Sequence, residues 1–272
     1  FVSRGLGDVY KRQVIGNPID HSLSPKLQNR WLKENNIDAT YDKIKLEDHE
    51  IKNFIQTIKE QKIAGCNVTV PFKKTVIPFL DKLSPEAEQT QSVNTIVFDN
   101  GNLVGYNTDI VGFGTAIKKL NFNIKGKKVL ILGAGGVAPS IIFALKNMYV
   151  KEITISNRTR DKAENLKALF HNLKILEWGN ITDFHMIINA TSLGLNNEII
   201  NLDFPSSGNN KLFYDVIYNP NETPFLQIGK QLGYKTENGK TMFVYQALQA
   251  FKLWHKVEPK VNTDTFKLLD ND

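Results

Sequence analysis

Short segments of apolar and polar residues alternate along the chain, and their period switches between that of a strand and that of a helix. In the second half, an apolar run over 128–132 precedes a glycine-rich turn, a segment with helical periodicity over 140–145 and an alternating segment over 150–156. Further strands are expected near residues 187 and 214. Strands that alternate with helices in this way predict a parallel sheet with helices packed against it.

The first half of the chain also alternates between strand-like and helix-like segments. Its pattern predicts helices over 27–35, 49–61 and 110–120 and strands over 14–16, 41–46, 63–70, 93–98 and 103–106. A strongly apolar helix is expected over 242–254. No repeat and no low-complexity linker interrupts these segments, so we predict an α/β protein with two domains.

Composition narrows the class of protein. The chain has 272 residues, and its 41% hydrophobic and 23% charged content is typical of globular proteins. No apolar run is long enough to cross a membrane, and the single Cys66 is expected to be a buried thiol of a cytoplasmic protein. The five histidines lack the spacing of metal ligands, so no metal site is expected. The net charge of +6 is spread along the chain, which disfavours nucleic-acid binding and would help to attract anionic small molecules.

The first 13 residues differ from the rest of the chain because they show no clear period. Lys11, Arg12 and Gln13 are polar where a strand that leads into Val14 should be apolar. We therefore expect residues 1–13 to be a non-native stretch and the first strand to be shortened.

The end of the strand over 150–156 indicates the cofactor. The preceding turn over 133–138 reads G-x-G-x-x-A between a strand and a helix, as in dinucleotide-binding units. Such units bind the adenosine ribose at the end of the next strand, where an acid would accept a hydrogen bond from the 2′-hydroxyl of NAD. Arg158, Arg160 and Lys162 gather there instead, and cationic donors suit a 2′-phosphate. We predict NADP(H), although a βαβ unit with an ordinary basic helix start would share the pattern.

Two groups of polar residues follow strands in the first half. Ser22 and Ser24 precede a predicted helix. Ser24 before a proline fits a helix cap, whereas two hydroxyls near a helix N-terminus also suit a small carboxylate. Asn67 and Thr69 face one side of a predicted strand that exits through a proline to Lys73. This arrangement is typical of an active-site edge, although an edge strand with a surface lysine would give the same pattern.

Asn94 and Asp109 belong to two further polar strings at strand ends. Asp109, or Thr108 before it, could simply cap the helix over 110–120. Alternatively, the Asp109 carboxylate could pair with Lys73, hold its ammonium group and help to pass a proton to a developing alkoxide.

Together these strings closely resemble those of the shikimate dehydrogenase family, in order from Val14 nearly to the C-terminus. The matching strings are Gly16-Asn17-Pro18-Ile19, His21-Ser22-Leu23-Ser24-Pro25, Asn67-Val68-Thr69-Val70-Pro71-Phe72-Lys73, Val93-Asn94-Thr95, Asn107-Thr108-Asp109, Gly133-Ala134-Gly135-Gly136, Asn157-Arg158-Thr159, Ile188-Asn189-Ala190-Thr191-Ser192, Tyr214-Asp215-Val216-Ile217-Tyr218, Thr223-Pro224-Phe225-Leu226 and the final Gly239, Met242 and Gln246-Ala247. The resemblance implies two α/β domains flanking a cleft: a substrate-binding domain over 1–108, a Rossmann-type NADP domain over 109–238, and C-terminal helices over 239–272 that return to the first domain.

The resemblance also implies an activity, the reversible reduction of 3-dehydroshikimate to shikimate by NADPH in chorismate and aromatic amino-acid biosynthesis. Lys73 and Asp109 would form the proton-transfer pair. The substrate would be bound by Ser22, Ser24, Asn67, Thr69, Asn94, Tyr218 and Gln246. The cofactor would be bound by Gly133, Ala134, Gly135, Gly136, Val137, Ala138, Asn157, Arg158, Thr159, Arg160, Thr191, Ser192, Gly239 and Met242.

Three alternatives stay open at this point. A quinate/shikimate branch that often uses NAD is disfavoured by the lack of an acid after Arg158, but substrate breadth cannot be read from the chain. A non-catalytic sensor would have no need of both Lys73 and Asp109. A folate-type dehydrogenase would lack the serine pair.

The chain departs from the family pattern at Pro139 and Ile110, and a proline in the first helical turn should leave cofactor binding intact. Both a monomer and a homodimer are compatible with the sequence.

Overall fold

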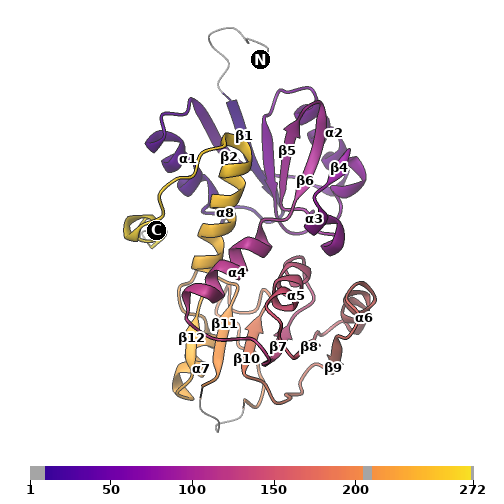
Figure 1. Ribbon diagram of the computed structural model, residues 1–272, viewed down its shortest axis with the longest axis vertical. Coiled ribbons are helices and arrows are strands. Elements are labelled where there is room, and N and C mark those ends of the chain that lie inside the picture. Colours follow the sequence, from indigo (N-terminus) through magenta and orange to yellow (C-terminus); the bar gives the residue numbers. More distant parts are fainter. Residues whose placement is uncertain (1–9, 205–209, 271–272) are drawn as a thin grey trace. The chain divides into compact units, whose positions relative to one another are not determined.

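The computed structural model describes residues 10–204 and 210–270. The chain divides into two compact units (Figure 1), the first formed by Phe1–Thr108 with Ala247–Asp272 and the second by Asp109–Gln246. Each unit contains a six-stranded sheet. The α/β class predicted from the sequence is therefore confirmed, as is the parallel sheet expected in the second half.

The sheet of the first unit is mixed, with strand order β2-β1-β3-β5-β6-β4. The first three of these strands run parallel, and β5 pairs antiparallel with both β3 and β6. Asn100 and Gly101 join β5 to β6 with φ values of 48° and 82°, the left-handed conformation that a tight two-residue hairpin turn requires. The bounds are β1 (Tyr10–Gly16), β2 (Ala39–Lys45), β3 (Gly65–Val68), β4 (Lys82–Leu83), β5 (Thr95–Asp99) and β6 (Asn102–Tyr106).

Helices of the first unit follow from the spacing of apolar residues. In α2, Ile51, Phe54, Ile55 and Ile58 recur at the spacing of one helix face, and all four are buried in the core of this unit. The same logic places Trp31 of α1 in the interior. The helices are α1 (Ser24–Glu34), α2 (Ile51–Lys59), α3 (Pro85–Thr90) and α9 (Thr263–Lys267), with short 3₁₀ turns η1 (Asp48–Glu50) and η2 (Ile77–Phe79).

The second unit is a doubly wound parallel sheet with strand order β9-β8-β7-β10-β11-β12. Numbered along this unit, the order is 3-2-1-4-5-6, which is that of the Rossmann fold. The direction of winding reverses between β7 and β10, and ligands of such sheets bind at the carboxyl ends of the strands beside this reversal. The strands are β7 (Lys128–Leu132), β8 (Glu152–Ser156), β9 (Lys174–Leu176), β10 (Met186–Asn189), β11 (Leu212–Asp215) and β12 (Lys235–Glu237).

Both faces of this sheet are covered. Alternate residues of each strand point to opposite faces, so they belong to different cores. Val129 and Ile131 of β7 belong to the core on one face together with Ile141 of α5, whereas Leu130 and Leu132 belong to the core on the other. A nearly continuous apolar run is what a strand buried on both faces requires. The helices of this unit are α4 (Asp109–Lys119), α5 (Ala138–Asn147), α6 (Arg160–Leu169) and α7 (Pro224–Gln231), and α8 (Lys240–His255) begins in it.

The later part of α8, from Ala247 onward, belongs to the first unit, where it packs across the sheet (yellow in Figure 1). The Trp254 indole donates a hydrogen bond to the carbonyl oxygen of Ile96 at 3.0 Å, and its ring lies 6.1 Å from that of Tyr41. Gln28 donates to the carbonyl of Ala247 at 3.1 Å. The apolar helix expected over 242–254 is therefore confirmed, and its C-terminal part contributes to the core of the first unit.

Three local expectations differ from the structure. β1 is not shortened: it begins at Tyr10 and pairs with β2 and β3. Arg12 and Gln13 are buried, and the Arg12 guanidinium lies 5.5 Å from the centre of the Trp254 ring, which α8 places over the sheet. Residues 1–9 lie outside the described part, and the non-native origin of 1–13 stays a prediction. Ser24 does not cap α1, because the helix already begins there; Ser22 Oγ accepts the Ser24 N–H at 3.3 Å. The strand expected over 63–70 is shorter, because the chain turns where Phe72 N–H donates to the Thr69 carbonyl.

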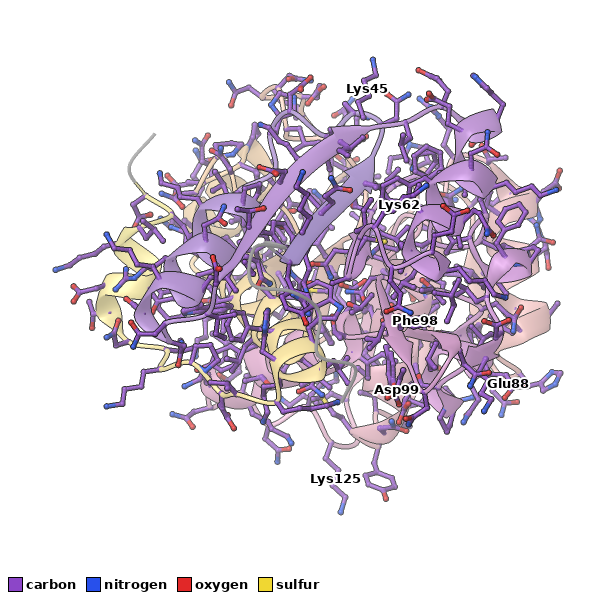
Figure 2. The ribbon with its side chains drawn as sticks, turned by 90° about the horizontal axis from the view of Figure 1, so that it is seen from above. Lys45, Lys62, Glu88, Phe98, Asp99 and Lys125 are labelled. Carbon is purple, nitrogen blue, oxygen red and sulfur yellow. The ribbon has the colours of Figure 1, made fainter. Side chains whose placement is uncertain are left out.

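Lys45 and Lys125, one from each unit, are both exposed, and their side chains project outward (Figure 2). Within the described residues, no helix combines the length and apolarity needed to cross a membrane, and no group of three or more His, Cys, Asp or Glu side chains could hold a metal ion. Cys66 is fully buried, and burial raises the pKa of its thiol.

Candidate active site

The glycine-rich turn joins β7 to α5 at the carboxyl edge of the second sheet, beside the reversal in strand order. Gly133 has a φ of +106°, and a Cβ there would lie 2.8 Å from both the Ala190 carbonyl oxygen and Thr191 Cγ2. Only glycine fits this position. Ala138, the first residue of α5, donates its N–H to the Gly135 carbonyl at 3.1 Å, and Pro139 has no N–H. The positive end of the α5 dipole, rather than these N–H groups, would therefore favour a phosphate here.

The end of β8 is tied to this turn by one side chain. Asn157 Oδ1 accepts a hydrogen bond from the backbone N–H of Ala134 at 2.9 Å, and its Nδ2 donates to the Thr159 carbonyl at 2.7 Å. Arg158 follows directly and is exposed, as is Lys162 in the first turn of α6. A basic, acid-free strand end beside a glycine turn fits the 2′-phosphate of NADP.

Arg160, a third basic residue of this cluster, is engaged elsewhere. Its guanidinium donates to Glu177 at 2.8 Å and to Glu164 at 3.3 Å. Two carboxylates already neutralise this side chain, so Arg158 is the stronger candidate for an anionic ligand.

The strand end after β10 approaches the glycine turn from the other side. Asn189 is fully buried, and its Oδ1 accepts hydrogen bonds from Thr191 N–H at 3.1 Å and Thr191 Oγ1 at 2.7 Å. Thr191 Oγ1 in turn accepts from Leu193 N–H at 3.0 Å. Thr191 is half-buried and Ser192 is exposed, so the turn presents short polar groups at the edge that holds the glycine turn.

The remaining expected ligand residues of the second unit lie on α8 or against it. The Tyr218 ring stacks on Phe243 with centroids 4.3 Å apart, and Gln246 Nε2 donates to the Phe243 carbonyl at 2.9 Å. Met242 is buried in the same turn of the helix. Gly239 lies just before α8, where a Cβ would clash with the Val216 carbonyl oxygen. This close approach fixes where the helix begins.

The side chain of Asn67, one of the expected substrate residues, is held by hydrogen bonds within the first unit. It lies on β3 and is buried. Its Nδ2 donates to the Asn94 carbonyl and to Thr95 Oγ1, each at 3.0 Å, and its Oδ1 accepts from the Tyr41 hydroxyl at 2.6 Å. These three bonds hold the amide in one orientation.

Asn94 lies next to it and is equally constrained. Its Oδ1 accepts from Thr108 N–H at 2.7 Å, and its Nδ2 donates to Thr108 Oγ1 at 2.8 Å. Thr69 lies just beyond β3, where its N–H donates to the Ile15 carbonyl at 2.9 Å. The structure therefore brings Asn67, Asn94 and Thr108 into one buried polar network at the strand ends of the first unit.

The two expected proton-transfer residues occupy buried positions in different units. Lys73 follows the turn after β3, and its backbone carbonyl accepts the Val93 N–H at 2.8 Å. Lys73 is only 8% exposed. Asp109 is the first residue of α4 and is 6% exposed. Lysine and aspartate are rarely so buried unless they are paired. Ser22, Ser24, Asn67, Thr69, Asn94 and Lys73 thus belong to the first unit, and Asp109, Tyr218, Gln246 and all cofactor residues belong to the second.

Sequence reasoning missed several polar residues that support these groups. Thr95, Thr108 and Tyr41 fix the amides of Asn67 and Asn94, and Asp215 fixes Asn189. Thr95 and Thr108 stand inside matching strings and could have been found there. Tyr41 has no such signal, because it reaches Asn67 from another strand.

Comparison with known proteins adds independent evidence. Residues 14–96 match the family model of the shikimate dehydrogenase substrate binding domain, and residues 115–201 match that of shikimate / quinate 5-dehydrogenase.

Individual relatives cover nearly the whole chain. A shikimate dehydrogenase (NADP(+)) of Pelagibacter ubique (strain HTCC1062) is 54% identical over 94% of this chain and 97% of its own. The crystal structure of shikimate dehydrogenase from Aquifex aeolicus is 34% identical with a TM-score of 0.88, covering 97% of this chain and 98% of that one. Shikimate 5-dehydrogenase from Listeria monocytogenes, solved with shikimate and NAD, is 31% identical with a TM-score of 0.87 over 98% of both chains. The resemblance inferred from the motifs is confirmed, and this chain belongs to the shikimate dehydrogenase family.

Proposed function

We propose that this chain catalyses the reversible NADPH-dependent reduction of 3-dehydroshikimate to shikimate in chorismate and aromatic amino-acid biosynthesis. The observation that carries the proposal is the match to the Pelagibacter enzyme over almost the full length of both chains. As a family member the chain is an NADP-dependent oxidoreductase that acts on a CH–OH group. The direction, the pathway and the residue roles below are the parts that we propose.

NADPH supplies the hydride when it is bound. The chain's own residues would bind and orient it: the backbone after Gly133 and the N-terminus of α5 suit the pyrophosphate, and Arg158 suits the 2′-phosphate. The turn at Thr191 and Ser192 would border the same ligand, because it packs on Gly133.

The substrate is a small carboxylate ring that carries hydroxyl groups, and the first unit offers groups of matching chemistry. The hydroxyls of Ser22 and Ser24, with help from Tyr218, would bind the carboxylate. Asn67, Thr69, Asn94 and Gln246 would bind ring hydroxyls. Asn67 and Asn94 are fixed by internal hydrogen bonds, and such rigidity lowers the entropic cost of ligand binding.

Lys73 and Asp109 would move the proton. When the carbonyl carbon accepts a hydride, its oxygen gains negative charge and needs a proton to become a hydroxyl. The Lys73 ammonium would give that proton, and the Asp109 carboxylate would orient the ammonium group and help to restore its proton. In the reverse direction Lys73, as the neutral amine, would take the proton from the substrate hydroxyl.

The alternative that stays closest is the branch that uses NAD or accepts quinate, since the Listeria relative was solved with NAD. Arg158 and the lack of an acid at the end of β8 favour NADP here. A non-catalytic sensor is disfavoured, because both Lys73 and Asp109 are present and buried.

The test is nicotinamide reduction by the purified protein in four pairings, shikimate or quinate with NADP or NAD. We expect turnover with shikimate and NADP to exceed the other pairings. Turnover of quinate, or a preference for NAD, would move the chain to the broader branch. If no pairing reacts while NADPH still binds, the chain is a binding module.

A further inference from the structure

We propose that Asp215 and Asn189 form a buried pair that fixes the conformation of the turn over 190–194, which borders the proposed cofactor site. Asp215 would act as a positioning residue, because it reaches this turn only through the side chain of Asn189. This inference rests on the proposed NADPH-dependent function. Asp215 is the last residue of β11 and Asn189 the last residue of β10, and both are 0% exposed. A carboxylate in such a place is costly unless its oxygens are hydrogen-bonded.

Donors surround both oxygens of Asp215. Asn189 Nδ2 lies 3.1 Å from Oδ1 and 3.1 Å from Oδ2. Ile217 N–H donates to Oδ1 at 3.0 Å, and Thr223 Oγ1 donates to Oδ2 at 2.6 Å. Burial raises the pKa of this carboxyl group, and these hydrogen bonds offset the rise only in part, so that the pKa is about 6.

The carboxylate decides which way the Asn189 amide points. A carboxylate only accepts hydrogen bonds, so the Asn189 NH₂ group must face Asp215 and its carbonyl oxygen must face away. That oxygen accepts from both the N–H and the hydroxyl of Thr191, at 3.1 and 2.7 Å. The NH₂ group also donates to the Leu193 carbonyl at 3.0 Å. One oriented amide therefore closes the turn from Asn189 to Leu193.

This turn fits tightly against the glycine turn. Ala190 N–H donates to the Leu132 carbonyl at 2.8 Å, and the space where Gly133 would carry a Cβ is filled by Ala190 and Thr191. A reversed Asn189 amide would present NH₂ to two donors of Thr191 and displace that residue. Because Thr191 borders the glycine turn, the displacement would change how both turns meet the cofactor.

Thr223 provides a matched control. Its hydroxyl donates to the same carboxylate, and it also caps α7, where Oγ1 accepts the Leu226 N–H at 3.4 Å. Thr223 also packs on Gly194 of the 190–194 turn, where a Cβ would lie 3.2 Å from Thr223 Cβ and 3.3 Å from its Cγ2. Valine keeps both of these carbons, so Thr223→Val removes the hydroxyl from Asp215 and from the α7 cap while the packing on Gly194 is retained. Comparing Asp215→Asn with Thr223→Val therefore distinguishes an effect on the orientation of the 190–194 turn from a general loss of stability of the second unit.

The experiment measures the NADPH dissociation constant, kcat, both KM values and the melting temperature of the full-length wild type and its variants. Asp215→Asn is expected to raise the NADPH dissociation constant and the KM for NADP about tenfold, the loss of one hydrogen bond to a charged group. Its kcat at saturating cofactor should stay within about threefold. Thr223→Val should lower the melting temperature while the NADPH dissociation constant stays within about twofold.

A reciprocal exchange keeps the test decisive where Asp215→Asn folds poorly. Asn189→Asp combined with Asp215→Asn restores a carboxylate opposite an amide and still offers acceptor oxygens to Thr191, but it gives up the hydrogen bond that Asn189 donates to the Leu193 carbonyl. We therefore expect this double variant to recover part of the NADPH affinity that Asp215→Asn loses. A double variant that folds but binds NADPH no better than Asp215→Asn would overturn the proposal. Equal weakening by Thr223→Val, or normal affinity in Asp215→Asn, would overturn it too. A wild type that neither binds NADPH nor reduces NADP would instead reject the proposed function.

Discussion

Individual residues carry the choice of cofactor, and Arg158 is the one to change. Arg158→Ala should raise the KM for NADP about ten- to hundredfold, as expected for lost charged hydrogen bonds, and leave the KM for NAD nearly unchanged. Arg160→Ala is the matched control, because Arg160 already bonds to Glu164 and Glu177. Initial rates with both cofactors provide the measurement. If Arg160→Ala raised the KM for NADP more than Arg158→Ala, the assignment of the 2′-phosphate site to Arg158 would be wrong.

The proposed proton-transfer role of Lys73 can be tested by substitution, with the neighbouring Lys74 as the control. Lys73→Met keeps the length of a buried side chain and removes its proton, so turnover should fall about 10²- to 10⁴-fold, the usual contribution of general acid–base catalysis. NADPH affinity should stay near that of the wild type. Lys74→Met is the control, since Lys74 is adjacent and exposed. If both variants turn over alike, Lys73 has no place in the mechanism.

At this scale the sequence predicted residue types better than their partners. Asn67, Lys73 and Arg158 could be singled out because each stands in a short polar string at a strand end. The bond from Tyr41 to Asn67 and the bonds from Asn189 to Asp215 join residues that are 26 positions apart in each case. Such contacts are set by strand order, which local pattern does not reveal. The Glu177 partner of Arg160 was missed for the same reason.

Among the elements, the turn between β7 and α5 depends most on a single residue. Gly133→Ala should abolish measurable NADPH binding, because the added Cβ would lie 2.8 Å from the Ala190 carbonyl. Gly126→Ala isolates the contribution of backbone strain, since Gly126 also has a positive φ of 72° but nothing lies within 4 Å of its Cβ position. That control should lose only about 1 kcal/mol of stability and retain NADPH binding. Fluorescence titration with NADPH compares the two, and equal affinities would contradict the packing argument.

Long elements were predictable from the sequence and short ones were not. The apolar period located α2, α8 and the central strands β7 and β8, because each buries a regular set of side chains. β4, β9 and β12 are only two or three residues long, too short for alternation to be recognised. The burial of Arg12 in β1 was also missed, since its guanidinium is covered by Trp254, which lies 242 positions further along the chain in α8.

On the scale of the whole molecule, each unit contains a buried titratable group with an opposite effect on stability. In the second unit, the raised pKa of Asp215, about 6 against an ordinary 3.8, favours the folded state below pH 3.8, and this contribution is lost as the pH rises through 6. In the first unit, burial together with the smaller effect of the Arg12 charge lowers the pKa of His255 from 6.5 to about 3. That contribution is complete above pH 6.5 and is lost as the pH falls toward 3.

His255 lies in the last turn of α8, with its ring 4.4 Å from that of Phe251, so protonation would place a charge in the packed end of the helix. We expect acidification from pH 7 to 5 to lower the melting temperature of the first unit, and His255→Gln to flatten this dependence. The slope cannot exceed about 1.4 kcal/mol per pH unit and should be smaller, because the ring is partly exposed. Trp31 and Trp254 lie in this unit and Trp178 lies in the second, so tryptophan fluorescence follows the first unit when both proteins also carry Trp178→Phe. The loss of stability in acid arises because His255 binds a proton in the unfolded chain, and a neutral glutamine cannot do so. If the melting temperature depends on pH equally in wild type and His255→Gln, other groups control the acid response.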